Sequence, residues 1–322
     1  MHTHILDFWY VGNVPGIEEM GVLQRELNRY VRKGWSLCTA LVFAGLYFVV
    51  LPAVLEGQYE AYVGVWGSEQ HVVVFGTFLL DVVVLWSLFA LVSIVYRWRP
   101  ASLERCKAQA FQPWPWESNP KAWSLQQRKT LVTILLNLHV LAPLSMYIDS
   151  LSGVYFRLDR ASYPSTWEIL TQMVFFMVVE DCSFYFLHRL LHTRSLYRLV
   201  HKQHHEYTST IAYAALYAHP VEFVLGNMLP VGLGPKLLGS RVHIMTYWLW
   251  VVLRDGETID GHSGYELGWS PFRLLPFSAG SQYHAFHHSQ NSGNFGSFFT
   301  LWDSVLGTNE PYYRAIEAKK SH

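Results

Sequence analysis

Residues 167–192 read WEILTQMVFFMVVEDCSFYFLHRLLH and join an apolar segment directly to two histidines. Residues 167–187 have the length and composition of a helix that crosses a bilayer. His188 and His192 lie four positions apart, so a continuing helix presents both imidazoles on one face. Imidazole is the commonest metal ligand near neutral pH. The stretch therefore predicts a membrane helix that ends in a metal-binding pair.

Two further histidine clusters lie downstream of this pair. They are HKQHH, with His201, His204 and His205, and HAFHH, with His284, His287 and His288. At helical spacing, each cluster can aim two or three nitrogens at one point. The eight imidazoles exceed the four ligands of a closed zinc site, and burying them without a shared ligand would leave many polar atoms unpaired. The count indicates two metal ions and oxidative chemistry. Zinc hydrolysis through a metal-bound water is the alternative, but it needs fewer histidines.

Further residues are candidates for the same site. His262 in DGHSGYE is a ninth candidate ligand, and His219 in YAHPVE is a weaker one. A metal-bound histidine usually donates its other ring nitrogen to a neighbouring acceptor. Glu180, Asp181 and Asp260 are the candidate acceptors.

The composition is that of an integral membrane protein. Hydrophobic residues make up 51% of the 322 residues, and charged residues make up 15%, against about 25% in soluble domains. The net charge of zero excludes a global basic field for nucleic acid. Four segments are apolar enough to span a bilayer, namely residues 36–55, 72–96, 130–148 and 167–187. Residues 209–252 are interrupted by Pro and Gly and predict a re-entrant hairpin or one or two weaker spans.

Charge asymmetry orients these spans. Seven Lys and Arg residues lie in the 97–129 loop, whereas the loop between the first two spans carries only acids. Four basic residues also precede the first span, namely Arg25, Arg29, Arg32 and Lys33. By the positive-inside rule, both basic segments and His188 face the cytoplasm. The expected fold is all-α, an integral membrane helical bundle of about four transmembrane helices plus a re-entrant or weaker hairpin, with a cytoplasmic histidine-rich helical cap.

Polar residues inside membrane helices normally face the interior of the bundle. Asp81, in the second span, is therefore expected to pair with Asn137 or His139 of the third span in a structural role. His71 and His243 lie outside the clusters and are expected at the surface.

The histidine clusters and the residues around them resemble a known superfamily. The stretches are EDCSFYFLHRLLH, VHKQHHEYT, LYAHPVEFVLGNMLP, DGHSGYELGWSPFRLLPF and YHAFHHSQNSGNFGSFFTLWDSVLGT. They resemble the membrane fatty acid hydroxylase / sterol desaturase superfamily over roughly residues 130–312, and within it the C-4 methylsterol oxidases. Some superfamily members carry a further histidine four residues before the equivalent of His262, where this chain has Thr258.

This resemblance implies a multi-pass mono-oxygenase of the endoplasmic reticulum membrane with a cytoplasmic active site. Such an enzyme oxidises the C-4 methyl group of 4-methyl or 4,4-dimethyl sterols stepwise to a carboxylate, which a sterol C-4 decarboxylase then removes. It uses a non-haem diiron site, O₂ and electrons from NAD(P)H through cytochrome b5 and its reductase. The implied ligands are His188, His192, His201, His204, His205, His262, His284, His287 and His288.

The resemblance also divides the chain. Residues 1–129 are expected to form an N-terminal membrane region with two spans and a connector, residues 130–312 the catalytic domain, and residues 313–322 a tail. The tail ends in KKSH, which resembles a dilysine retrieval signal. A sterol C-5 desaturase, a sterol hydroxylase and a fatty acyl hydroxylase share the histidine boxes and stay open as alternatives. A non-catalytic sterol-binding membrane protein with a structural metal site is the alternative from another class.

Overall fold

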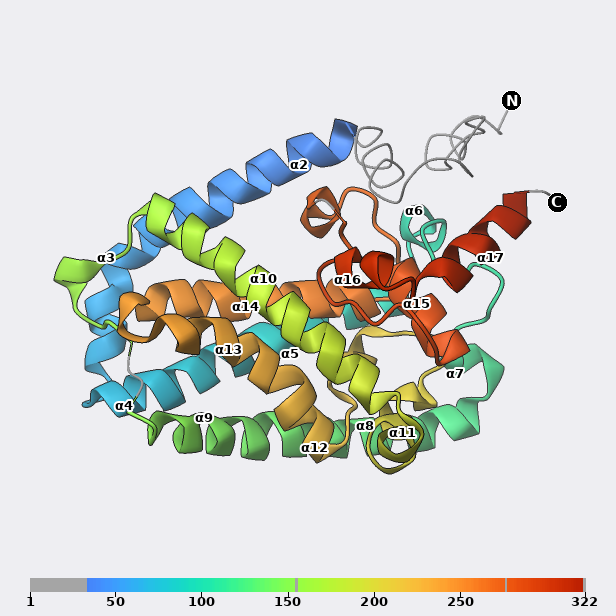
Figure 1. Ribbon diagram of the computed structural model, residues 1–322, viewed down its shortest axis with the longest axis horizontal. Coiled ribbons are helices and arrows are strands. Elements are labelled where there is room, and N and C mark those ends of the chain that lie inside the picture. Colours follow the sequence, from blue (N-terminus) through green and yellow to red (C-terminus); the bar gives the residue numbers. More distant parts are fainter. Residues whose placement is uncertain (1–33, 154–155, 276, 321–322) are drawn as a thin grey trace.

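The computed structural model describes residues 34–153, 156–275 and 277–320. Long helices lie side by side, and shorter helices gather at one end of them (Figure 1). The described residues contain no strand and only three isolated β-bridges. The expected all-α fold is confirmed.

Four helices are long and apolar enough to cross a membrane, at Cys38–Gly64, Glu69–Trp98, Pro120–Ser150 and Thr166–Leu191. They contain the four predicted spans. The first consists of α2 (Gly34–Gly45), η2 (Leu46–Val50) and α3 (Leu51–Gly64); the second of α4 (Glu69–His71), η3 (Val72–Gly76) and α5 (Thr77–Trp98). The third consists of α8 (Pro120–Leu136), η4 (Asn137–Leu141) and α9 (Ala142–Ser150), and α10 (Thr166–Leu191) is the fourth.

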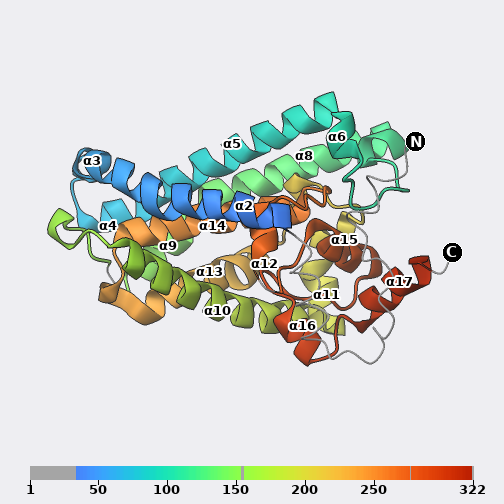
Figure 2. The ribbon, with the colours of Figure 1, turned by 90° about the horizontal axis from the view of Figure 1, so that it is seen from above.

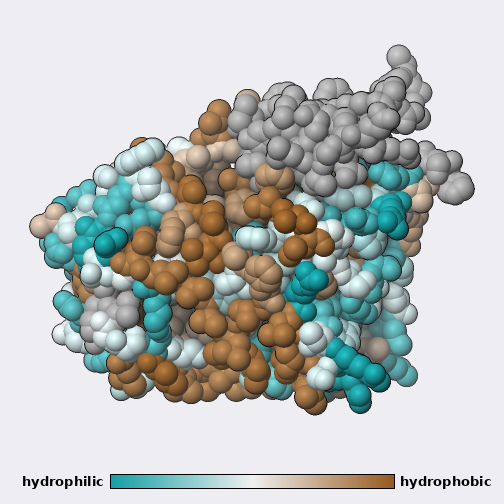
Figure 3. Space-filling model, viewed as in Figure 1, coloured by the Kyte–Doolittle hydropathy of each residue, from teal (hydrophilic) through white to brown (hydrophobic). Residues whose placement is uncertain are grey.

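The outer surface of the bundle suits lipid contact. Leu41, Val132 and Val178 are exposed on three different spans. Hydrophobic side chains cover the middle of the face drawn in Figure 3, and hydrophilic ones gather toward its ends. An apolar band of this size on a soluble protein would be an aggregation hazard, so it supports a membrane bundle. Two features from the sequence analysis, the basic residues 25–33 and the end of the KKSH tail, lie outside the described residues.

Local sequence explains how these helices begin and where they widen. Ser165 caps α10 by accepting the backbone N–H of Glu168 at 3.2 Å. Three π-helical turns lie just before or around a proline. The prolines are Pro52, Pro143 and Pro230, and in each case the turn contains the residue four positions before the proline. Proline offers no N–H to that residue, and its ring crowds the carbonyl there. The helix therefore widens by one residue and continues.

Residues 209–252 form a helical hairpin, one of the arrangements expected. The elements are η7 (Ala212–Leu216), α12 (Pro220–Glu222), η8 (Phe223–Met228), α13 (Leu229–Leu238), η9 (Gly239–Arg241) and the first part of α14 (Ile244–His262). Gly234 of α13 permits close packing on α10, because a Cβ there would lie 3.0 Å from Cα of Phe176. α14 runs back toward the histidines between α5 and α10 (Figure 2).

Several polar residues pair differently from the prediction. Asn137 donates to the carbonyls of residues 216 and 218, and His139 accepts from Trp86 at 3.1 Å. Asp81 instead lies beside Asp255 of α14. The expected pairing was wrong because α14, which the sequence left ambiguous, packs on α5. His243 is also buried rather than at the surface, because its Nδ1 caps α14 by accepting the N–H of residue 245 at 3.1 Å.

The remaining helices are short, and most of them surround the histidines. They are α6 (Ala101–Glu104), α7 (Pro115–Ser118), η5 (Arg160–Ser162), α11 (Arg194–Leu199), η6 (His201–Glu206), η10 (Pro271–Leu274), α15 (Ser281–Gln290), α16 (Leu301–Val305) and α17 (Glu310–Lys320). The connector between the second and third spans packs on the loop after α14. Ala108 N–H donates to the carbonyl of Gly264 at 2.8 Å, and the ring of buried Trp114 covers the same glycine.

Candidate metal centre

The three histidine boxes meet at the end of α10. His188 and His192 lie on and just after its last turn, HKQHH forms the 3₁₀ turn η6, and HAFHH lies in α15. His262 ends α14. The structure therefore brings together all nine histidines named as ligands from the sequence.

These histidines form two groups rather than one site per box. The ligand atoms within each group lie within 4.8 Å of one another. The first group contains His188, His192, His201, His205 and His287; the second contains His204, His262, His284 and His288. In both HxxHH boxes the first and last histidines share a group, and the middle one joins the other group. Each of these boxes therefore aims two nitrogens at one point, within the two or three expected, and gives its middle histidine to the other group.

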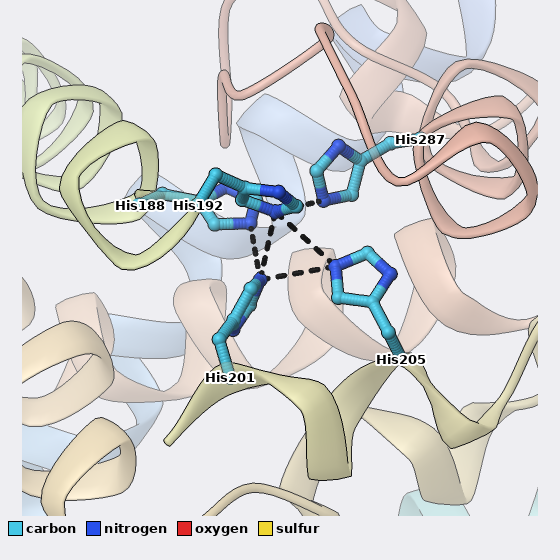
Figure 4. Close-up of side chains that lie close together, drawn as sticks. All are labelled: His188, His192, His201, His205 and His287. Atoms are coloured by element: carbon cyan, nitrogen blue, oxygen red, sulfur yellow. Dashed lines mark hydrogen bonds between the residues drawn. The ribbon is translucent and has the colours of Figure 1, made fainter. Parts of the chain in front are cut away.

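In the first group, Nε2 atoms converge on a common point (Figure 4). The Nε2 atom of His201 lies 3.2 Å from that of His188, 2.9 Å from that of His192 and 3.0 Å from that of His205. The Nε2 atoms of His192 and His287 are 3.2 Å apart. Two nitrogens each about 2.1 Å from one ion lie about 3.0–3.4 Å apart at octahedral or tetrahedral angles. The spacing fits imidazoles around one cation.

The second group has the same spacing. The Nε2 atoms of His262 and His284 are 2.8 Å apart, and those of His284 and His288 are 3.0 Å apart. His204 completes the group and is buried. Four imidazoles match the ligand count of a closed tetrahedral site, and five exceed it.

The Nδ1 atoms, on the other side of each ring from Nε2, show which tautomer five of these histidines adopt. The Nδ1 atoms of five histidines contact backbone carbonyl oxygens at 2.6–3.2 Å, namely those of His188, His192, His262, His287 and His288. A carbonyl only accepts, so Nδ1 carries the proton and Nε2 carries a lone pair. The Nε2 atoms of these five histidines therefore carry no proton, and the contact between Nε2 of His192 and Nε2 of His287 is not a hydrogen bond. Lone pairs directed at one point are what a metal ion requires.

Burial keeps these imidazoles neutral. It lowers the pKa of His192 and of His205 to about 3, and that of His262 to about 4. The neighbouring imidazoles add to the shift for the first two, because protonated neighbours would repel one another. Neutral imidazole is the form that binds a cation, so the chemistry of the donor set fits two metal ions.

The candidate acceptors from the sequence do not contact the ligands. Glu180 lies 3.1 Å from Arg254, Asp181 accepts the N–H of Phe299, and Asp260 pairs with Arg273. Glu180 is eight residues before His188, which places it about 12 Å away along the helix axis. His219 also lies outside both groups, because its Nδ1 accepts the N–H of Val221 at 3.2 Å and caps α12.

Glu222 is the acceptor that the sequence reading missed. Its Oε1 lies 2.8 Å from Nδ1 of His201, and both side chains are buried. Burial raises the pKa of the Glu222 carboxyl, whereas a cation on Nε2 of His201 favours the carboxylate by making Nδ1–H a stronger donor. An acid three residues after His219, within the motif YAHPVEF, was the available signal.

A cavity of about 180 Å³ opens onto both groups. Its lining includes His188 and His201 from the first group and three histidines of the second. It follows one face of α14 from Tyr247 to His262, a length of about 22 Å at 1.5 Å per residue. The wall away from the histidines is largely apolar and comes from α5, η4, α9, α13 and α14. The cavity suits an elongated apolar molecule with one end at the histidines.

Comparison with known proteins agrees with this architecture. The fatty acid hydroxylase family profile matches residues 173–308, which contain every histidine of both groups. Methylsterol monooxygenase 1 from Gallus gallus is 35% identical over 226 residues, 68% of this chain and 71% of the relative. Methylsterol monooxygenase 1-3 from Arabidopsis thaliana is 44% identical over 152 residues, 46% of this chain and about half (51%) of the relative.

The similarity also extends to a relative that is named for another activity. Very-long-chain aldehyde decarbonylase GL1-11 from Oryza sativa subsp. indica is 40% identical over 203 residues, 61% of this chain and 74% of that protein. No solved structure matches. The length and identity of these matches, together with the histidine boxes, show that the chain belongs to the fatty acid hydroxylase / sterol desaturase superfamily and is related to its methylsterol monooxygenases.

Proposed function

We propose that this chain is a membrane mono-oxygenase that oxidises the C-4 methyl group of 4-methyl or 4,4-dimethyl sterols stepwise to a carboxylate. The observation that carries the proposal is the pair of imidazole groups at one end of a largely apolar cavity within a membrane bundle. The names of the chicken and Arabidopsis relatives support the substrate class.

Two iron ions are the proposed occupants of the histidine groups. When bound, they would supply the activation of O₂ that attack on an unactivated methyl group requires. The protein's own part is orientation. Backbone carbonyls hold Nδ1–H of five ligands, and Glu222 holds that of His201, so the rings do not rotate away from their common points.

The cavity wall would position the substrate and exclude water. Leu138, Ala142 and Met146 line it at every fourth position of the third span, and Val231 and Val251 line it from the hairpin. Such a surface packs against a rigid hydrocarbon. Asp81 and Leu85 of α5 also line the cavity. We therefore propose that the N-terminal membrane region, residues 1–129, contributes α5 as one wall of the catalytic domain at residues 130–312, with residues 313–322 as a tail.

Electrons would come from NAD(P)H through cytochrome b5 and its reductase. The support is a basic surface beside the first histidine group, made of four exposed cations that form no salt bridge with any described residue: Arg189, Arg194, Arg198 and Lys202. Tyr197 lies within this surface, and its ring centroid is 5.6 Å from that of His192. An acidic carrier docked here would lie one side chain from the first group. Placement in the endoplasmic reticulum membrane, with this surface in the cytoplasm, belongs to the same proposal.

A second candidate function follows from the rice relative, which is named an aldehyde decarbonylase. Such an enzyme would act on a long-chain aldehyde in the same cavity. An assay with membranes that contain the protein distinguishes the two functions. The membranes are supplied with NADH and with either 4,4-dimethylsterol or a long-chain aldehyde. We expect 4-hydroxymethyl and 4-carboxy sterols by mass spectrometry. Alkane formation with unchanged sterols would refute C-4 oxidation, and C-5 desaturation products would assign the chain to the desaturases.

A further inference from the structure

We propose that Asn227 and Thr258 form a polar subsite in the cavity, which binds the hydroxyl group next to the carbon that is oxidised. The inference rests on the proposed sterol substrate and deepens it, because it names the residues that would recognise the substrate's polar group. Both residues are neutral, so their hydrogen bonding does not depend on a protonation state.

The hydroxyl of Thr258 faces the cavity. Thr258 lies four positions before His262 in α14, so the two side chains share one face of the helix, and both line the cavity. A helical threonine often donates to the carbonyl one turn earlier, as Thr171 does at 2.9 Å. The Thr258 hydroxyl forms no hydrogen bond with any described residue, and its oxygen keeps accessible surface. Four residues place it about 6 Å from His262 along the helix axis.

The amide of Asn227 faces the same cavity from the hairpin. Leu225 and Leu229, two positions to either side, are exposed on the outer surface of the bundle. Two residues turn a helix by about 200°, so Asn227 points away from that surface, and it lines the cavity. Its amide keeps accessible surface and forms no hydrogen bond within the described part of the chain. Asn227 follows Glu222, the partner of His201, by five residues, or about 8 Å along the axis.

The charged residues of α14 in this cavity contact other charged residues. Arg254 pairs with Glu180 at 3.1 Å and with Glu257, and Asp255 lies beside Asp81. The amide and the hydroxyl have no such neighbours, and a polar group without a partner in apolar surroundings is destabilising. An amide and a hydroxyl both donate and accept hydrogen bonds, as an alcohol does. A ligand hydroxyl therefore matches both groups.

The chemistry of the substrate places its hydroxyl at this level of the cavity. In a 3-hydroxy-4,4-dimethylsterol, the hydroxyl is the only polar group, on the ring carbon bonded to the carbon that carries the methyl groups. Only two carbon atoms separate a methyl group from the hydroxyl oxygen. A methyl group held at the histidines therefore brings the hydroxyl about one helical turn away, where Asn227 and Thr258 lie. The apolar remainder extends toward Tyr247 at the far end of the cavity.

The test compares an alcohol with an analogue that lacks the hydroxyl. It measures equilibrium binding of radiolabelled 3-hydroxy-4,4-dimethylsterol and its 3-deoxy analogue to the purified metal-loaded protein in nanodiscs, without reductant. We expect the wild type to bind the alcohol about tenfold more tightly. Thr258→Val keeps the shape of the side chain without the hydroxyl, and Asn227→Leu removes the amide. Each should lower the ratio to about threefold, and the double variant to about one.

Thr246→Val is the matched control. It makes the same change in the same helix, but the Thr246 hydroxyl is buried and does not line the cavity. This variant should keep the wild-type ratio. The metal content of every variant is measured alongside, so that a damaged metal centre is recognised.

The outcomes separate this inference from the proposed function. Equal binding of the two sterols by the wild type overturns the subsite, whether or not any variant folds. An unchanged ratio in the double variant with normal metal content also overturns it, because the hydroxyl then binds elsewhere. Sterols that bind with the expected ratio but are not oxidised once reductant and O₂ are supplied would refute only the proposed function. Failure of both sterols to bind would refute both.

Discussion

Neighbouring residues His204 and His205 should have different effects on metal content when each is replaced by alanine. His204 belongs to the group of four imidazoles, so His204→Ala leaves three. His205 belongs to the group of five, so His205→Ala leaves four, which is still a complete tetrahedral set. We expect metal content to fall from about two ions per chain to about one in the first variant and to stay near two in the second.

A double variant makes the assignment sharper. His288 comes from another box but shares the group of His204. His204→Ala/His288→Ala should therefore retain about one ion per chain, the same as the single variant, because both changes remove the same ion. The assay is elemental analysis of purified protein after dialysis against a chelator at which the wild type keeps its metal. Equal losses in His204→Ala and His205→Ala, or a double variant with no metal, would refute the division into two groups. His219→Ala is the control and should bind metal as the wild type does, because His219 lies outside both groups.

Three further predictions concern stability and the electron donor. Burial lowers the pKa of His243 to about 4, below the usual 6.5, so the unfolded chain takes up a proton first as the pH falls. Other buried histidines lose stability over the same pH range, so the comparison with a variant isolates His243. Between pH 7 and pH 5, the free energy of unfolding, measured by thermal unfolding of the purified protein, should fall by about 2 kcal/mol less in His243→Asn, whose side chain can still cap the helix, than in the wild type. Replacing Arg194 and Arg198 by Glu should raise KM for an acidic electron donor by about tenfold at low salt. The same variant should keep the wild-type kcat when an artificial reductant replaces the donor. An unaltered KM would mean that the donor binds elsewhere. Gly264→Ala should lower the free energy of unfolding by more than about 2 kcal/mol, because φ is +74° and a Cβ would lie 2.7 Å from the carbonyl of residue 210. Gly261 has open space around it, so Gly261→Ala is the control and should unfold at the same temperature as the wild type.

The spans and the ligand set could be predicted because their signals are local. The length of an apolar segment and the helical spacing of histidines are both read from residues close together in the sequence. His188 and His192 follow an apolar segment of membrane-spanning length and lie four positions apart. The division of the two HxxHH boxes between two groups could not be read in this way. It is the same in the 3₁₀ turn of HKQHH and in the α-helix of HAFHH, so it depends on how the boxes pack against one another rather than on spacing within a box.

The environment of the ligands was harder to predict than the ligands themselves. Five of the Nδ1 partners are backbone carbonyls, which every residue possesses, so no residue type marks them. The side-chain partner, Glu222, lies in the segment whose topology stayed ambiguous. Glu180 and Asp181 were chosen for their closeness to His188 in sequence, but distance along a helix axis separates them from the ligands.

The interleaving of the boxes has a consequence for how the protein is made. Each histidine group includes at least one residue of α15, so the groups are complete only when the chain has been synthesised to residues 287 and 288. By then all four spans have left the ribosome, and the ions would enter a bundle that is already inserted. Once bound, each ion would tie together segments that are up to about a hundred residues apart, which restricts the unfolded chain in the way a cross-link does. Iron supply during biogenesis would then govern how much of this protein survives quality control, separately from how fast it turns over substrate.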